Sequence, residues 1–184
     1  GVSVLIIVIF SSMAAYALSR NKSKMSSFLF FLFVAAMLIP FQSVMIPLVT
    51  IFGNLEMLNR PGIIFMYLGF GSSLSIFLYH GVLNSIPQSL DEAATIDGAN
   101  RFQIYWYIIF PMLKPITVTV AILNTIWIWN DYLLPSLVIN QEGMETLPLK
   151  MFFFFGEYTK QWHLALAGLT LAIIPVIIAY FLAQ

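Results

Sequence analysis

Three of the eight acidic residues of this chain gather in one ten-residue segment, Ser89 to Gly98, which reads S-L-D-E-A-A-T-I-D-G. Ser89 and Glu92 have the spacing of a capping box, in which each side chain bonds the other's free backbone N–H. Asp91 and Glu92 would also lie in the first turn, where carboxylates suit the positive end of the helix dipole. Gly98 is well placed to end the helix in a left-handed cap. The segment therefore predicts a short helix with its own start and stop signals.

This predicted helix has only about two turns, which is too short to be stable alone in water. Leu90, Ala93 and Ala94 share one face, and the two alanines allow another backbone to approach closely. Such a helix could dock into a second protein, or it could lie flat among lipid headgroups. Glu92 likewise has two interpretations, because it could cap the helix only, or also pair with a basic residue of a docked partner.

No arrangement of residues in the sequence predicts catalysis, a metal site or a bound cofactor. None of the ten glycines is followed by lysine, so the chain lacks a phosphate-binding P-loop. The motifs H-E-x-x-H and G-x-S-x-G are absent, and the chain has no cysteine. His80 and His163 are far apart in sequence. We therefore expect a protein that is not an enzyme by itself.

The composition indicates a membrane protein. The chain of 184 residues is 60% hydrophobic and only 9% charged, with 17 phenylalanines. Soluble domains are typically about 45–50% apolar and about 25% charged. The formal net charge is zero, so the chain has no basic field that would hold nucleic acid. We expect an all-α polytopic membrane protein, because a helix of roughly 20 apolar residues crosses the hydrocarbon core of a bilayer.

Five stretches are apolar and long enough to span a membrane. The second contains Pro40 and Pro47, which should kink it or turn its far end into a re-entrant or loop structure. The fifth contains Pro175. The five predicted spans are Gly1–Ser19, Met25–Leu55, Pro61–Leu90, about Ile108 to Tyr132, and Gln161–Gln184.

Basic residues predict the orientation, because they favour the cytoplasmic side of short loops. If the first span ends in the cytoplasm, five of the eight basic residues lie inside and the segment from 85 to 101 is a cytoplasmic loop. Those five are Arg20, Lys22, Lys24, Arg101 and Lys114.

Polar residues within spans are candidates for lining a transport pathway. Asn124 would lie near mid-membrane, and Asn130 and Asp131 near the outer end of the same helix. Trp127 offers an aromatic face that can stack on a sugar ring. For Asn124 the alternative is an interhelical hydrogen bond, and for Asp131 a solvated helix end.

The spacing around the short helix resembles the EAA loop of ABC importer permeases. Glu92-Ala93-Ala94, three residues, Gly98, nine residues, Ile108, one residue and then Phe110-Pro111 follow the signature E-A-A-x3-G-x9-I-x-L-P. Phe110 in place of leucine is the one departure. The flanking segments 14–20, 39–47 and 124–135 are similar to the second permease subunit of carbohydrate importers, the maltose-transporter type.

The resemblance implies a single permease domain over residues 1–184, with residues 85–101 as its cytoplasmic coupling loop. It implies six spans, so that one amino-terminal span and a carboxyl-terminal tail would lie outside the five visible ones. It places the protein in a prokaryotic cytoplasmic (inner) membrane as a multi-pass protein. The residues implied to couple to the ATPase are Ser89, Leu90, Asp91, Glu92, Ala93, Ala94, Asp97 and Gly98.

The partners implied by the resemblance are a second permease subunit, a dimer of ABC ATPases that binds ATP and magnesium, an extracytoplasmic solute-binding protein and membrane lipid. The solute would be a sugar or oligosaccharide. Permeases for other solutes share the EAA loop, so an importer of a non-sugar solute stays open at this point. A secondary transporter or channel is the alternative of a different class, although it would need intramembrane charges or broken-helix repeats.

Overall fold

The computed structural model describes residues 1–139, 143, 145–152 and 162–183. Within these ranges the regular structure is helical, without strands, as expected for an all-α membrane protein. Two helices are long and apolar enough to cross a membrane, α1 (Val2–Arg20) and α4 (Arg60–Leu83). Two broken pairs raise the number to four if each pair counts as one span. The count of five spans stays a prediction.

The breaks fall where proline interrupts the apolar runs. The second predicted span separates at Met37–Pro40 into α2 (Lys24–Ala36) and α3 (Phe41–Asn54), because Pro40 cannot donate a helical hydrogen bond. Pro47 is accommodated inside α3. In the same way, α11 (Trp162–Ala183) continues through Pro175.

The fourth predicted span differs from the single helix expected over Ile108 to Tyr132. It bends by 77° at Leu113, between Arg101–Met112 and α8 (Lys114–Asn130). Pro115 lacks the N–H that would bond the carbonyl four residues earlier, and its ring crowds that carbonyl, which explains the break. The first half is itself irregular, because a π-helical stretch η1 lies between α6 and α7. The bounds are Arg101–Ile104 for α6, Tyr105–Ile109 for η1 and Phe110–Met112 for α7.

The chain separates into two compact units, each of which combines two stretches of sequence. The first unit is Gly1–Pro40 with Tyr67–Ala121, and the second is Phe41–Met66 with Ile122–Gln184. Helices α4 and α8 therefore contribute residues to both. The single permease domain stays a prediction.

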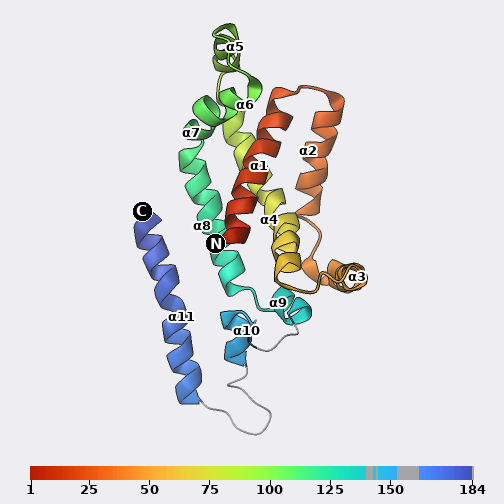
Figure 1. Ribbon diagram of the computed structural model, residues 1–184, viewed down its shortest axis with the longest axis vertical. Coiled ribbons are helices and arrows are strands. Elements are labelled where there is room, and N and C mark those ends of the chain that lie inside the picture. The colour runs from red at the N-terminus through yellow and green to blue at the C-terminus, as the bar shows by residue number, and fades with distance from the viewer. Residues whose placement is uncertain (140–142, 144, 153–161, 184) are drawn as a thin grey trace. The chain divides into compact units, whose positions relative to one another are not determined.

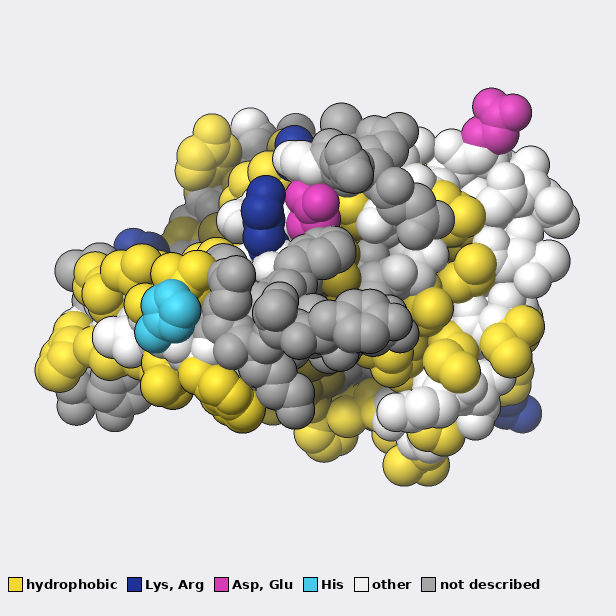
Figure 2. Space-filling model, turned by 90° about the horizontal axis from the view of Figure 1, so that it is seen from below, with side chains coloured by type: hydrophobic (Ala, Val, Ile, Leu, Met, Phe, Trp, Pro, Cys, Tyr) yellow, Lys and Arg dark blue, Asp and Glu magenta, His cyan; other side chains and the backbone are white. Residues whose placement is uncertain are grey.

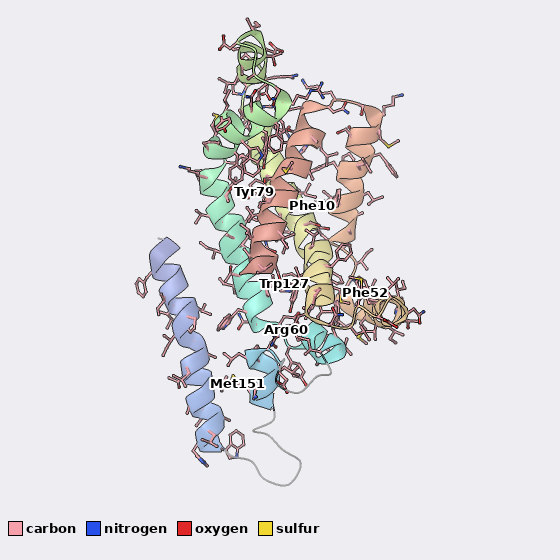
Figure 3. All side chains as sticks on the ribbon, in the orientation of Figure 1. Phe10, Phe52, Arg60, Tyr79, Trp127 and Met151 are labelled. Carbon is pink, nitrogen blue, oxygen red and sulfur yellow. The ribbon has the colours of Figure 1, made fainter. Side chains whose placement is uncertain are left out.

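In the first unit, α1, α2 and the longer part of α4 surround an apolar core that includes Tyr79, Leu83 and Ile109. Tyr79 is fully buried, and its hydroxyl donates to Thr117 Oγ1 on α8 over 3.0 Å (Figure 3). The short helix α5 (Ser89–Ile96) lies at one end of this unit, beyond the end of α4 and beside α6 (Figure 1).

The second unit holds α3, α9 (Leu133–Val138), α10 (Leu147–Phe152) and α11. Helix α10 contacts α11, and α3 contacts α9. The Trp129 indole N–H donates to the carbonyl of Ala172 over 3.1 Å, which joins the end of α8 to α11. Met151 on α10 (Figure 3) helps to line a cavity of about 380 Å³ beside Trp129.

Large apolar side chains are widely exposed on the described helices. Phe31 of α2 is 67% exposed and Leu171 of α11 is 66% exposed. Figure 2 shows hydrophobic side chains at many places on the face that it draws. Exposure of this extent is costly in water but suits helices that face lipid or a partner subunit.

Candidate functional site

The start of α5 corrects one prediction from the sequence. The N-cap residue is Gln88, whose side chain makes no capping bond, and Ser89 is already helical. The amide of Leu90 donates to the carbonyl of Pro87, so the turn begins before Ser89. A capping side chain requires an extended backbone at its own residue. The predicted Ser89–Glu92 capping box is therefore wrong, and a capping box forms instead at Asn100 and Gln103, at the start of α6.

The end of α5 is as predicted. Gly98 has a φ of +87°, in the left-handed region. Its amide donates to Thr95, and the amide of Ala99 donates to Ala94, over 3.1 and 3.0 Å. This pair of bonds is a Schellman motif, which satisfies carbonyls that the helix end would otherwise leave free. A Cβ atom at Gly98 would meet nothing within 4 Å, so backbone conformation, not space, favours glycine there.

Asp91 joins α5 to the end of α1. Its Oδ2 forms an ion pair with Nη2 of Arg20 at 2.9 Å, and its Oδ1 accepts a hydrogen bond from the Tyr16 hydroxyl. The side chains of Arg20 and Asp91 are only 16% and 14% exposed. From the sequence we expected Asp91 to interact with the helix dipole and to take part in coupling to the ATPase. In the structure its carboxylate contacts Tyr16 and Arg20 of the same chain.

Arg20 also closes the end of α4. Its Nη1 donates to the carbonyl of Ile86 over 3.1 Å and, more weakly, to that of Leu83 over 3.4 Å. Carbonyls at the carboxyl end of a helix lack partners within it and carry partial negative charge, so a guanidinium is well suited to them. One side chain thus contacts the ends of three helices.

Tyr16 continues these contacts toward η1. Its ring lies 5.4 Å from that of Tyr105, and the guanidinium of Arg20 lies over the Tyr16 ring at 5.8 Å. Tyr105, in turn, shares a hydrogen bond of 2.7 Å with the buried hydroxyl of Ser12. The segment after α5 is therefore tied to α1 as well.

The remaining surface of α5 is open. Glu92 and Ala93 are exposed, Leu90 is 37% exposed and Ile96 is 86% exposed. Ala94, in contrast, is buried in the core of the first unit, so the predicted face of Leu90, Ala93 and Ala94 is divided between the core and the surface.

A cavity of about 620 Å³ lies beside α5 in the first unit. Polar and charged side chains dominate its lining, and Ala17 and Ile104 add apolar surface. The polar and charged members are Tyr16, Arg20, Asn21, Gln88, Asp91, Glu92, Thr95 and Arg101.

Tyr16 and Arg20 were not singled out as site residues from the sequence, although a signal existed. Tyr16 lies in the last turn of the first predicted span and Arg20 directly follows that span, four residues later, so the two share a face if the helix continues. The predicted orientation also placed Arg20 and the loop with Asp91 on the same side of the membrane. A tyrosine and an arginine on that face are suitable partners for a carboxylate of the loop.

The predicted pathway residues lie on α8 or directly after it. Asn124 is buried and Trp127 is 41% exposed on α8 (Figure 3). The Asn130 amide donates to the carbonyl of Ile126 in its own helix. Asp131 Oδ1 accepts from the amide of Leu133, at the start of α9. Their lining of a pathway stays a prediction.

The structure shows no candidate metal centre in the part of the chain that it describes. No three potential metal ligands among histidine and carboxylate side chains lie together there. The His80 ring stacks on Phe30 with 4.0 Å between centroids, and its Nδ1 lies 3.2 Å from the amide of Asn84. These contacts are structural.

A family model described as "Binding-protein-dependent transport system inner membrane component" matches residues 7–184. A permease protein for starch degradation products from Thermoanaerobacterium thermosulfurigenes, AmyC, is described as probable and is 65% identical, over 99% of this chain and 66% of its own length. The multiple sugar-binding transport permease MsmG of Streptococcus mutans is 39% identical, over 99% of this chain and 67% of its own.

A third relative is MelC of Bacillus subtilis, a melibiose, raffinose and stachyose import permease, at 38% identity over all of this chain and 67% of its own. This chain thus spans about two thirds of the length of these relatives.

A solved structure agrees with the relatives. A chain in the crystal structure of a bacterial ABC transporter that imports the acidic polysaccharide alginate matches with a TM-score of 0.80 and 30% identity. The match covers all of this chain and 69% of the other. The relatives are transport permeases, and the resemblance seen in the E-A-A spacing is confirmed. The chain belongs to the binding-protein-dependent inner-membrane components, the multi-pass permease subunits of ABC importers.

Proposed function

We propose that this chain forms half of the translocation pathway of an ATP-driven importer for a sugar or oligosaccharide. The other half would be a second permease subunit, and a dimer of ABC ATPases would bind ATP and magnesium. An extracytoplasmic binding protein would deliver the solute. The names of three relatives, which refer to starch degradation products, multiple sugars, and melibiose, raffinose and stachyose, support the solute class.

The observation that carries the mechanism is the combination of anchoring and exposure in α5. Asp91 and Ala94 hold the helix against the first unit, while Glu92 and Ile96 remain open. A helix held on one side and exposed on the other suits docking into a cleft of an ATPase. Exposed Ile96 would supply apolar contact, and Glu92, since it caps nothing in its own helix, is available for a basic residue of the ATPase.

The movement of the ATPase would then be transmitted to the membrane spans through α5. When ATP closes the ATPase dimer, the two coupling helices of the permease pair approach each other, and the attached spans change from inward- to outward-facing. The binding protein then releases sugar into the exposed cavity. Such a change needs a ligand or partner with different affinity for the two states, and ATP on the ATPase supplies this difference.

Uptake by a bacterial strain that lacks this subunit tests the proposal. The full-length chain should restore ATP-dependent uptake of at least one labelled sugar from a panel of maltotriose, raffinose and arabinotriose. It should also co-purify with an ATPase and a second permease. If the chain restored uptake of an amino acid or phosphate but of no sugar, the proposed solute class would be wrong. Uptake that persists without the ATPase would contradict an ABC importer and favour a secondary transporter or channel.

A further inference from the structure

We propose that Tyr16, Arg20 and Asp91 form a brace that makes α5 move together with α1. Through this brace, displacement of α5 by the ATPase would reach α1 directly, in addition to the route along the peptide chain. The inference rests on the proposed function and adds positioning residues to it. Neither Tyr16 nor Arg20 touches the solute or the ATPase in this proposal.

The chain connections of α5 alone are poor transmitters of force. The helix has eight residues, and it is joined to α4 by the non-helical stretch from Asn84 to Gln88. On the other side, the left-handed Gly98 interrupts the path to α6. A short helix between two irregular linkers would pivot when pushed from one side, unless side chains fix it to its neighbours.

The contacts of Asp91 provide this fixation. Both carboxylate oxygens are used, one by the Arg20 guanidinium at 2.9 Å and the other by the Tyr16 hydroxyl. The Tyr16 hydrogen bond directs one oxygen, and the Arg20 charge attracts the other at close range without forming a hydrogen bond to it. The two partners together hold the carboxylate between α1 and α5. The shielded location of the ion pair makes it less sensitive to salt than a surface pair.

Arg20 extends the brace from α5 to α4. Because its Nη1 donates to the carbonyls at the end of α4, the guanidinium holds the ends of α1, α4 and α5 together. The charges also suit their positions, since Arg20 is in the last turn of α1 and Asp91 is in the first turn of α5. The brace is therefore compatible with the local stability of both helices.

The brace reaches the segment after α5 through aromatic rings. Tyr16 packs on Tyr105 of η1, and Tyr105 bonds Ser12 one turn earlier on α1. The two ends of the loop that carries α5 are thus both attached to α1. A push on α5 would move α1, the end of α4 and η1 as one body.

The test compares solute import with ATP hydrolysis in the complete importer, reconstituted in vesicles with its binding protein. The probe is maltotriose or raffinose, as selected by the uptake panel. For Asp91→Asn we expect the number of sugar molecules imported per ATP hydrolysed to fall about fivefold to tenfold, which is the lower end of typical coupling between sites. Co-purification of the ATPase should be unchanged, because the exposed face of α5 is intact.

Two further variants and one control separate positioning from folding. Tyr16→Phe keeps the ring and removes one contact of Asp91, so the ratio should fall by a smaller factor. Asp91→Glu keeps the charge and should recover most of the ratio. Lys22→Gln removes an exposed positive charge two residues from Arg20 and should leave the ratio at the wild-type value. A merely structural role would lower the amount of assembled importer but not its ratio.

The double variant Arg20→Gln with Asp91→Asn should be no worse than the more impaired single variant, because both changes remove the same contact. The brace would be contradicted if the losses of the two single variants added up in the double variant, or if the import ratio were unchanged in Asp91→Asn and Tyr16→Phe. Neither result would contradict the proposed function as an importer. If the wild-type assembly imports none of the sugars with ATP, the proposed function fails and the brace fails with it.

Discussion

The end of the first unit that carries α5 and the part of the second unit around the end of α8 use their polar side chains differently. In the first, Asp91 bonds residues 71 and 75 positions earlier in the chain. In the second, Asn130 donates to a carbonyl four residues before it, and Asp131 accepts from an amide two residues after it. The contacts of Asp91 fix α5 to other helices, whereas the Asn130 bond lies within its own helix and the Leu133 bond lies at the start of the next one. Trp129 adds a bond from the end of α8 to α11.

A mutation at the first kind of contact should change the coupling of the importer, whereas a mutation at the second should change local structure. When a polar contact between distant elements is lost, every element that it joined loses an attachment. A contact within one helix end can be replaced by water or a neighbouring group.

Gly98→Val should have the largest effect on uptake, because it changes the end of α5. Valine is strained at a φ of +87°, and we expect α5 to lose its Schellman ending at a cost of about 3 kcal/mol, with loss of most uptake. Gly98→Asn is the matched control, because asparagine tolerates the left-handed region. Uptake and co-purification of the ATPase measure the effect. Normal uptake by Gly98→Val would show that this helix ending is not needed for coupling.

Arg20→Gln tests the anchored side of α5. We expect a cost of about 2 kcal/mol, because Asp91 would remain largely buried without a cation and the end of α4 would lose its donor. A cost of that size corresponds to about thirtyfold more frequent local opening. Trypsin cleavage after Arg101 in inside-out vesicles would report it. Equal cleavage rates in Arg20→Gln, Lys22→Gln and wild type would contradict the anchoring role.

Tyr105→Phe tests how much the contact between η1 and α1 contributes within the first unit. The variant loses one buried hydrogen bond, but Ser12 keeps its bond to the carbonyl of Val8. We expect a loss of about 1 kcal/mol. Thermal unfolding of the purified importer measures the loss, and Ser12→Ala should produce a similar one. A loss as large as that of Arg20→Gln would mean that η1, not Asp91, provides the main attachment.

Trp129→Phe and Asn130→Ala have the smallest expected effects and compare two neighbours on α8. Trp129→Phe removes the bond to Ala172, and we expect about 0.6 kcal/mol, the average for interhelical hydrogen bonds in membranes. Asn130→Ala should cost less, because it loses only a bond within its own helix. If Asn130 lines the pathway, the KM for sugar uptake should rise without a change in stability. An unchanged KM would remove Asn130 from the pathway.

Much of the site could be predicted because its signals are local. Gly98 could be predicted without reference to other helices, because the positive φ of its own turn favours glycine. The capping box failed for a local reason too, because the turn at Pro87 and Gln88 begins the helix one residue earlier than the serine suggests. Asp91 was selected, but its partners could not be derived from spacing within the loop.

The helical, membrane-embedded character of the chain follows from its sequence, because apolar runs of span length with few charges are compatible with few other folds. The sequence also determined the family, through residue types at fixed spacing around Glu92 and Gly98. Only the tertiary structure decided that Asp91 faces Tyr16 and Arg20 while Glu92 faces outward. The reason is that adjacent residues on a helix point in directions about 100° apart. Which direction meets another helix depends on packing that no local pattern records.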